Sequence, residues 1–126
     1  MPATFDRQSL GKAGEDLACR ELERRGYAIS ARRYRTRFGE IDIVADDGGV
    51  VVFVEVKARR SNRCGSAAEA ISWRKRRRIA AMALDYLAWT HSLNRRCRFD
   101  VVAIDRLGSP EMTVRVIQDA FQVEGG

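Results

Sequence analysis

The segment Gly39-Glu-Ile-Asp-Ile-Val-Ala-Asp-Asp-Gly-Gly-Val-Val-Val-Phe-Val-Glu-Val-Lys57 predicts a β-hairpin that carries carboxylates among its β-branched residues. Gly48 and Gly49 suit a tight two-residue turn, because both can adopt the positive φ angles that such a turn requires. With that turn, Asp42 on the first strand lies opposite Glu55 on the second. We therefore expect two carboxylates side by side.

The two-residue period of a strand divides the side chains of this hairpin between two faces. Glu40, Asp42, Glu55 and Lys57 are expected on one face, with Glu40 opposite Lys57; the other face is expected to carry Ile41, Ile43, Val52, Val54 and Val56.

Like charges directly opposite each other destabilise a strand pair, so folding alone gives no reason for the facing carboxylates. A divalent cation would remove the conflict, because carboxylate oxygens suit hard cations such as Mg²⁺ or Mn²⁺. The ammonium of Lys57 could then orient or deprotonate a water, or stabilise charge on a phosphate under attack. The alternative is a solvated face on which Glu40 and Lys57 form a cross-strand ion pair. We favour the metal site with a catalytic lysine over the solvated face.

Four motifs together resemble the YraN family of bacterial proteins and, more broadly, the PD-(D/E)xK nucleases, which include restriction endonucleases and archaeal Holliday-junction resolvases. They are Gly11-x-x-Gly-Glu15, Gly39-Glu-Ile-Asp42, Val52-Phe-Val-Glu55-Val-Lys57 and Arg98-Phe-Asp100, within a region of similarity from about Gly11 to Asp105. One departure is Ile41, which stands where the superfamily pattern has proline. The resemblance implies a restriction-endonuclease-like fold and a site for Mg²⁺ or Mn²⁺. Its implied ligands are Asp42, Glu55 and the backbone carbonyl of Val56, with Lys57 as the catalytic lysine.

Glu15 stands on a predicted helix from about Ser9 to Arg25, where it shares a face with Gly11, Ala18 and Leu22. An acidic side chain on an apolar stripe needs a partner. By resemblance, Glu15 completes the acidic set and reaches the metal directly or through a water. The alternative is a glutamate in the first turn of the helix, where the helix dipole favours it.

The charge pattern indicates a polyanionic partner. Lysine and arginine number 23 against 17 acidic residues, and the basic residues fall in several separate clusters rather than along one amphipathic anchor. We expect no membrane association, and we expect nucleic acid, DNA in preference to RNA, to be bound by Arg35, Arg37, Arg59, Lys75, Arg76, Arg77 and Arg78. Lys75 falls at i+4 spacing with Ile71, Ile79 and Ala83, so it either reaches a phosphate from the buried stripe or packs its stem there. Solvated charge runs are the alternative for the arginines.

Other site classes find little support in the composition. Cys19, Cys64 and Cys97 are an odd number without a C-x-x-C pair, which argues against a disulfide framework or a zinc site. His91 is the single histidine. The sequence shows neither a signal-peptide core nor an apolar run of about 18 residues. We therefore expect a cytoplasmic protein.

Hydrophobic periodicity predicts one α/β domain over residues 1–126, with a core from about 9 to 119, in the order α-β-β-β-α-β-β. The central mixed sheet flanked by helices is implied by the resemblance. After the helix come a strand at Tyr27–Arg33, a basic loop at Tyr34–Phe38, the hairpin, a loop at Ser61–Ser66, a long helical region at about Ala67–Thr90, and strands at Arg98–Ile104 and Thr113–Gln118.

We expect this chain to be a metal-dependent endonuclease-like hydrolase of DNA phosphodiesters, with a homodimer if branched DNA is the substrate. The alternative is a nucleic-acid-binding or assembly module that keeps the fold without turnover, because a fold does not fix a function. RNA is a third possibility. Trp73, Tyr34 and Phe38 could stack on unpaired bases, although core packing is the commoner use of aromatic residues.

Overall fold

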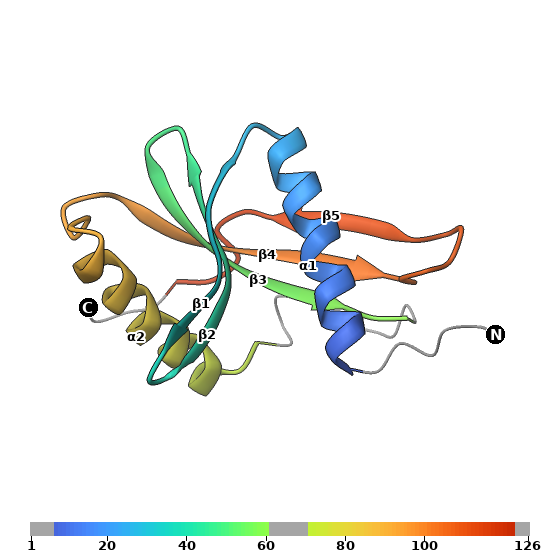
Figure 1. Ribbon diagram of the computed structural model, residues 1–126, viewed down its shortest axis with the longest axis horizontal. Helices are drawn as coiled ribbons and strands as arrows, with labels where there is room; N and C mark the ends of the chain where they lie inside the picture. Colours follow the sequence, from blue (N-terminus) through green and yellow to red (C-terminus); the bar gives the residue numbers. More distant parts are fainter. Residues whose placement is uncertain (1–6, 61–70, 123–126) are drawn as a thin grey trace.

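A five-stranded mixed sheet carries one helix on each face, in a computed structural model that describes residues 7–60 and 71–122 (Figure 1). Side chains are described from residue 11 onward. The elements are α1 (Arg7–Arg24), β1 (Ala28–Thr36), β2 (Gly39–Asp47), β3 (Val50–Ala58), α2 (Trp73–Trp89), β4 (Cys97–Asp105) and β5 (Thr113–Ile117). The predicted order of elements, and the mixed sheet between helices, are confirmed.

The strands lie in the sheet in chain order, β1-β2-β3-β4-β5. All neighbouring pairs are antiparallel except β3 and β4, which are parallel. A parallel pair needs a long crossover, and α2 lies in that connection. Neither helix is long and apolar enough to cross a membrane, within the residues described.

The β2–β3 hairpin has the predicted two-residue turn. Gly48 and Gly49 have φ angles of 59° and 97°, and the ladder starts at the pair Asp47 and Val50. The Asp46 carboxylate accepts a hydrogen bond of 2.9 Å from the Gly49 N–H, which fixes the turn. The register expected from the glycines is therefore confirmed at the closed end of the hairpin.

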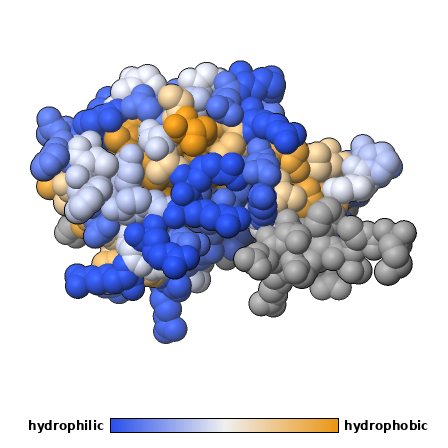
Figure 2. Space-filling model, in the orientation of Figure 1, coloured by the Kyte–Doolittle hydropathy of each residue, from blue (hydrophilic) through white to orange (hydrophobic). Residues whose placement is uncertain are grey.

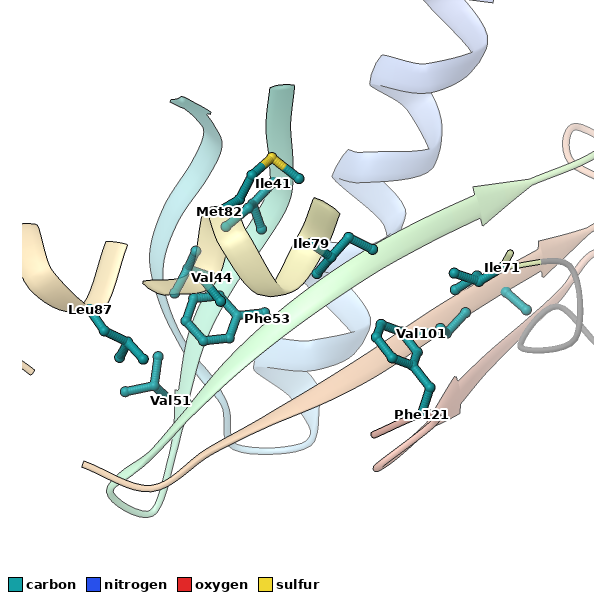
Figure 3. Packing of buried hydrophobic residues seen from close by; sticks show 12 residues of the cluster. Ile41, Val44, Val51, Phe53, Ile71, Ile79, Met82, Leu87, Val101 and Phe121 are labelled. Atoms are coloured by element: carbon teal, nitrogen blue, oxygen red, sulfur yellow. The ribbon is translucent and has the colours of Figure 1, made fainter. Parts of the chain in front are cut away.

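Alternating residues of the sheet feed two hydrophobic clusters. Phe53 and Val101 pack with Ile79 and Met82 of α2 on one face (Figure 3). On the other face, neighbouring strand residues such as Val52 and Val54 pack against Ala18, Cys19 and Leu22 of α1. Each helix thus has its own apolar face of the sheet to cover, which places α1 and α2 on opposite sides.

The open end of the β2–β3 hairpin differs from the prediction. The ladder ends at the pair Ile43 and Val54, so Asp42 and Glu55 are not ladder partners. Ile41 packs in the α2 cluster beside Met82, whereas Ile43 packs in the α1 cluster, so the expected common face is wrong (Figure 3).

The cause of this difference is that β2 leaves β3 and stays with β1. The β1–β2 ladder continues to the pair Thr36 and Gly39, and the tip of that hairpin bends away from β3 toward α2 (Figure 1). The Glu40 side chain pairs with Arg35 across this ladder, not with Lys57 as the alternative had it.

Two other element boundaries also differ from the prediction. β1 runs to Thr36, so the expected basic loop shrinks to Arg37 and Phe38. Ile71 and Ser72 precede α2 instead of belonging to it; the Ser72 hydroxyl caps the helix by accepting a hydrogen bond from the Lys75 N–H. The loop expected at residues 61–66 lies outside the described residues.

Candidate active site

The candidate site begins at the point where β2 separates from β3. There Oδ2 of Asp42 accepts a hydrogen bond of 2.8 Å from the backbone N–H of Val56. A carboxylate has thus taken the place of a strand partner for this N–H, because the β2–β3 ladder stops at Val54. Because the strands separate here, the Asp42 carboxylate points into the opening between them.

Asp42 is poorly compensated for its burial. Burial, followed by the negative charge of Glu55, raises the pKa of Asp42 to about 7. The Val56 N–H acts in the opposite direction, but it is too weak to restore an ordinary value. The two carboxylates therefore repel each other through space, as the sequence predicted, although they do not face each other in the ladder.

Lys75 brings a positive charge to these acids from α2. Its ammonium forms an ion pair with Oε1 of Glu55, which is itself 9% exposed. The predicted place of Lys75 on the inward stripe is confirmed, because Ile79 and Ala83 on the same stripe are buried. Although burial acts to lower it, the hydrogen bond and charge of Glu55 raise the pKa of Lys75.

Lys57 is the second lysine of the site, half-buried at the end of β3. Burial, and then the positive charge of Lys75, lower the pKa of Lys57 despite the attraction of Glu55 and Asp42. The two ammonium groups therefore differ: Lys75 is held charged by Glu55, whereas Lys57 is the one more easily deprotonated. This difference suits Lys57 to proton handling.

Glu15 approaches the site from α1. The helix packs closely on β3 at Gly14, where an added Cβ would stand only 2.8 Å from Cβ of Ala58. Glu15 is 8% exposed, and its negative charge contributes to the raised pKa of Asp42. The predicted inward face of α1 is confirmed for Glu15, Ala18 and Leu22, which are buried, whereas Gly11 is exposed.

Glu15 pairs with two arginines that sequence reasoning missed: Arg33 and, at the longer distance of 3.7 Å, Arg32. Nε of Arg33 donates to both carboxylate oxygens of Glu15, at 3.1 and 3.2 Å. Arg33 lies in β1 with a φ of 51°, and no sequence signal announces a left-handed residue within a strand. The alternative of a first-turn glutamate is wrong, because α1 begins at Arg7 and Glu15 stands two turns further on.

The metal ligands that this site offers are the carboxylates of Asp42 and Glu55, and carboxylate oxygens suit a hard cation. The hydrogen bond from Val56 and the ion pair with Lys75 use one oxygen of each carboxylate, Oδ2 of Asp42 and Oε1 of Glu55. A group of three His, Cys, Asp or Glu side chains that could hold a metal is absent from the same residues. Two carboxylates completed by substrate oxygens fit Mg²⁺, whereas Glu15 is engaged by Arg33.

The predicted nucleic-acid-binding residues fall into two groups. Arg77 and Arg78 are exposed on α2, and Arg37 is exposed in the β1–β2 turn, its guanidinium 4.9 Å from the ring centre of Phe38. Arg76 is partly buried and bound to its own chain: Nε donates to the Ile71 carbonyl at 3.1 Å and the guanidinium covers the Phe121 ring. Hydrophilic side chains cover much of the face drawn in Figure 2.

The other residues predicted to bind nucleic acid, and the aromatic residues predicted to stack on bases, differ in their surroundings. Arg35 pairs with Glu40, and Lys75 pairs with Glu55. Arg59 follows β3, where its backbone bonds to Ile104 and Leu107. Among the aromatic candidates, Trp73 is 63% exposed and Phe38 is 41% exposed. Tyr34 instead packs edge-on against Tyr86 and donates to Asp85, so core packing is its use.

Comparison with known proteins identifies the family. The sequence model of the uncharacterised protein family UPF0102 matches residues 14–104. A UPF0102 protein of Symbiobacterium thermophilum is 48% identical over 112 residues, which cover 89% of this chain and 95% of that protein. The chain belongs to the UPF0102 family.

Other UPF0102 proteins are similar over nearly the whole chain. One from Rhodococcus jostii is 44% identical over 90% of this chain and 96% of its own, and one from Geotalea uraniireducens is 42% identical over 94% and 93%. The resemblance to the YraN family is confirmed at this level. The region matched by the UPF0102 model contains the whole candidate site: Glu15, Asp42, Glu55, Lys57 and Lys75.

Proposed function

We propose that this UPF0102 protein is a metal-dependent hydrolase of DNA phosphodiesters. The observation that carries the proposal is the pair Asp42 and Glu55, a partly buried and a buried carboxylate that repel each other where β2 leaves β3. Folding gains nothing from such a pair, because a buried charge without full compensation is costly. Clusters of this kind are typical of functional sites. The order of strands and helices also fits the restriction-endonuclease-like fold that the sequence resembles.

In this proposal Asp42, Glu55 and the backbone carbonyl of Val56 hold Mg²⁺ or Mn²⁺. The bound cation would supply positive charge and Lewis acidity toward a phosphate oxygen. Lys57, whose pKa is lowered by burial and by Lys75, accepts a proton from the attacking water or orients that water. Glu15 supports the acidic set from α1, and the exposed arginines hold backbone phosphates without reading sequence.

The decisive experiment compares Lys57→Ala with wild type in cleavage and in binding. A group needed only when the phosphodiester is attacked affects turnover far more than affinity. We expect Mg²⁺- or Mn²⁺-dependent cleavage to fall by about 100-fold or more, and DNA affinity to stay within a few-fold. Linear, nicked, single-stranded and branched DNA and RNA are assayed, and preference for branched DNA would be accompanied by a homodimer in sedimentation.

Lys12→Ala is the matched control, because Lys12 is an exposed lysine on α1. It should cleave like wild type. Cleavage that survives Lys57→Ala, with contaminating nucleases excluded, would contradict the role given to Lys57.

A non-catalytic binding module is the second candidate, and one observation favours it. Glu55 and Glu15 already have cationic partners, Lys75 and Arg33. An acidic cluster neutralised within the protein can be purely structural. Wild-type protein that binds DNA but cuts none of the substrates with any divalent metal would establish this second function.

A further inference from the structure

The chain has only three lysines among its many basic residues, and two of them, Lys57 and Lys75, lie at the candidate site. They come from different elements. Lys57 is carried by β3 itself, whereas Lys75 reaches Glu55 from the first turn of α2. The second lysine is therefore a tertiary contribution to the site, and its role needs an explanation of its own.

Helix electrostatics argue against a cation at the position of Lys75. The N-terminus of a helix carries partial positive charge and favours anions, and the first turn of α2 contains no acidic residue. The ammonium nevertheless lies against Glu55, and only a third of the side chain is exposed. The charge of Lys75 thus gains from the acids of the sheet and not from its own helix.

The local structure fixes where this ammonium can be. The Lys75 N–H bonds to the capping hydroxyl of Ser72, and Arg76 anchors the same turn to the Ile71 carbonyl and the Phe121 ring. With its backbone held, the Lys75 side chain brings its charge to Glu55 and acts on Asp42 as well.

We propose that the Lys75 ammonium is a built-in counter-cation that competes with the divalent metal for Glu55. In the metal-free protein it neutralises part of the charge of Asp42 and Glu55, and a metal that binds Glu55 must compete with it for the negative charge of this carboxylate. This inference rests on the proposed function, because it assumes that these carboxylates bind a metal. Lys75 is a positioning residue in this role, since it acts through Glu55.

The first experiment measures metal affinity in Lys75→Met, which removes the charge and keeps an unbranched stem. Mn²⁺ is titrated calorimetrically at pH 8 into every protein, so that all affinities are compared at the same pH. We expect the variant to bind Mn²⁺ about tenfold more tightly than wild type, a difference of about 1.4 kcal/mol. Lys12→Met, on the exposed face of α1, should bind like wild type.

A second experiment tests the counter-cation without any metal. In chelator, Lys75→Met should lower the midpoint of thermal unfolding, because Asp42 and Glu55 then repel each other unshielded. The same substitution in a Glu55→Gln background should cost much less, since the ion pair is already gone. An equal loss in both backgrounds would show that only packing of the Lys75 stem matters, which overturns the proposal.

The wild-type titration distinguishes failure of the competition by Lys75 from failure of the proposed metal-dependent function. Wild type that binds Mn²⁺ as tightly as Lys75→Met overturns the competition but leaves the metal-dependent function standing. Absence of Mn²⁺ binding to both proteins overturns the competition and the proposed metal-dependent function together.

Discussion

Two carboxylates of this protein, the fully buried Asp100 and the partly buried Asp42, have opposite surroundings. Asp100 on β4 is fully buried and accepts four hydrogen bonds: from the Tyr27 hydroxyl at 3.0 Å, from the Asp119 N–H at 2.9 Å, and from two nitrogens of Arg98 at 3.0 and 3.1 Å. Within residues 7–60 and 71–122, the hydrogen bond that Asp42 accepts comes from one backbone N–H, that of Val56.

The comparison separates a structural acid from a functional one. Arg98 also donates to Asp47 and to the Tyr27 hydroxyl, which in turn accepts from Gln118. The Asp100 network therefore joins β2 and β4 to the residue before β1 and the residue after β5. A fully bonded buried network stabilises one structure. Lys75 pairs with Glu55 but not with Asp42, so the charge of these two acids is only partly compensated. Partial compensation disfavours folding and suits a ligand that brings positive charge.

The largest expected effect is the loss of stability in Asp100→Asn. Removing one partner of a buried charge pair leaves Arg98 partly unpaired, which typically costs about 3–5 kcal/mol. Urea unfolding at pH 7 measures the change in the free energy of unfolding. Asp105→Asn on the same strand is the control, because the partner of Asp105 is the exposed Arg115, and loss of this surface ion pair should cost about 1 kcal/mol or less. Equal losses in the two variants would remove the contrast drawn for Asp100.

A smaller effect of opposite sign, an increase in the free energy of unfolding, is expected for Asp42→Asn in the presence of a metal chelator. The unfolded Asp42 ionises near pH 4, whereas the folded one holds its proton up to about pH 7. Between these values the native state binds more protons, so the free energy of unfolding falls as pH rises, by an amount on the order of a few kcal/mol.

Asn cannot ionise, and Asp42→Asn should therefore be more stable than wild type at pH 8 and nearly equal to it at pH 4. Urea unfolding at a series of pH values measures this difference. A wild-type stability that rises between pH 4 and pH 7 as much as that of Asp42→Asn would contradict the assignment of Asp42 as an uncompensated acid.

The smallest effect concerns arginines in the same two kinds of surroundings. Replacing the exposed Arg77 and Arg78 together by Ala should reduce the slope of log affinity for DNA against log salt by about two, because each phosphate contact releases about one counterion. Stability should change little. Arg76→Ala should do the reverse, since Arg76 is bound to Ile71 and Phe121. An unchanged salt slope in the double variant would mean that these arginines are only solvated.

Much of the candidate site could be predicted, because its residues are fixed by short-range periodicity. The two glycines set the hairpin register, which brings Asp42 and Glu55 to the same end of the hairpin, and the 3.6-residue period turns Lys75 inward. The partner of Glu15 could not be predicted. Arg33 reaches it from another element through a left-handed backbone conformation, which the sequence does not encode locally.

The sequence by itself determined the order of elements, the turn of the central hairpin and the inward faces of both helices, because each depends on neighbours along the chain. Only the tertiary structure decided where β2 leaves β3, which cations meet which acids, and which arginines are exposed. The physical reason is that a strand ladder continues only while its partner stays alongside. The part of β2 that precedes Ile43 stays with β1 and bends toward α2, and the acidic site lies in the opening that this creates.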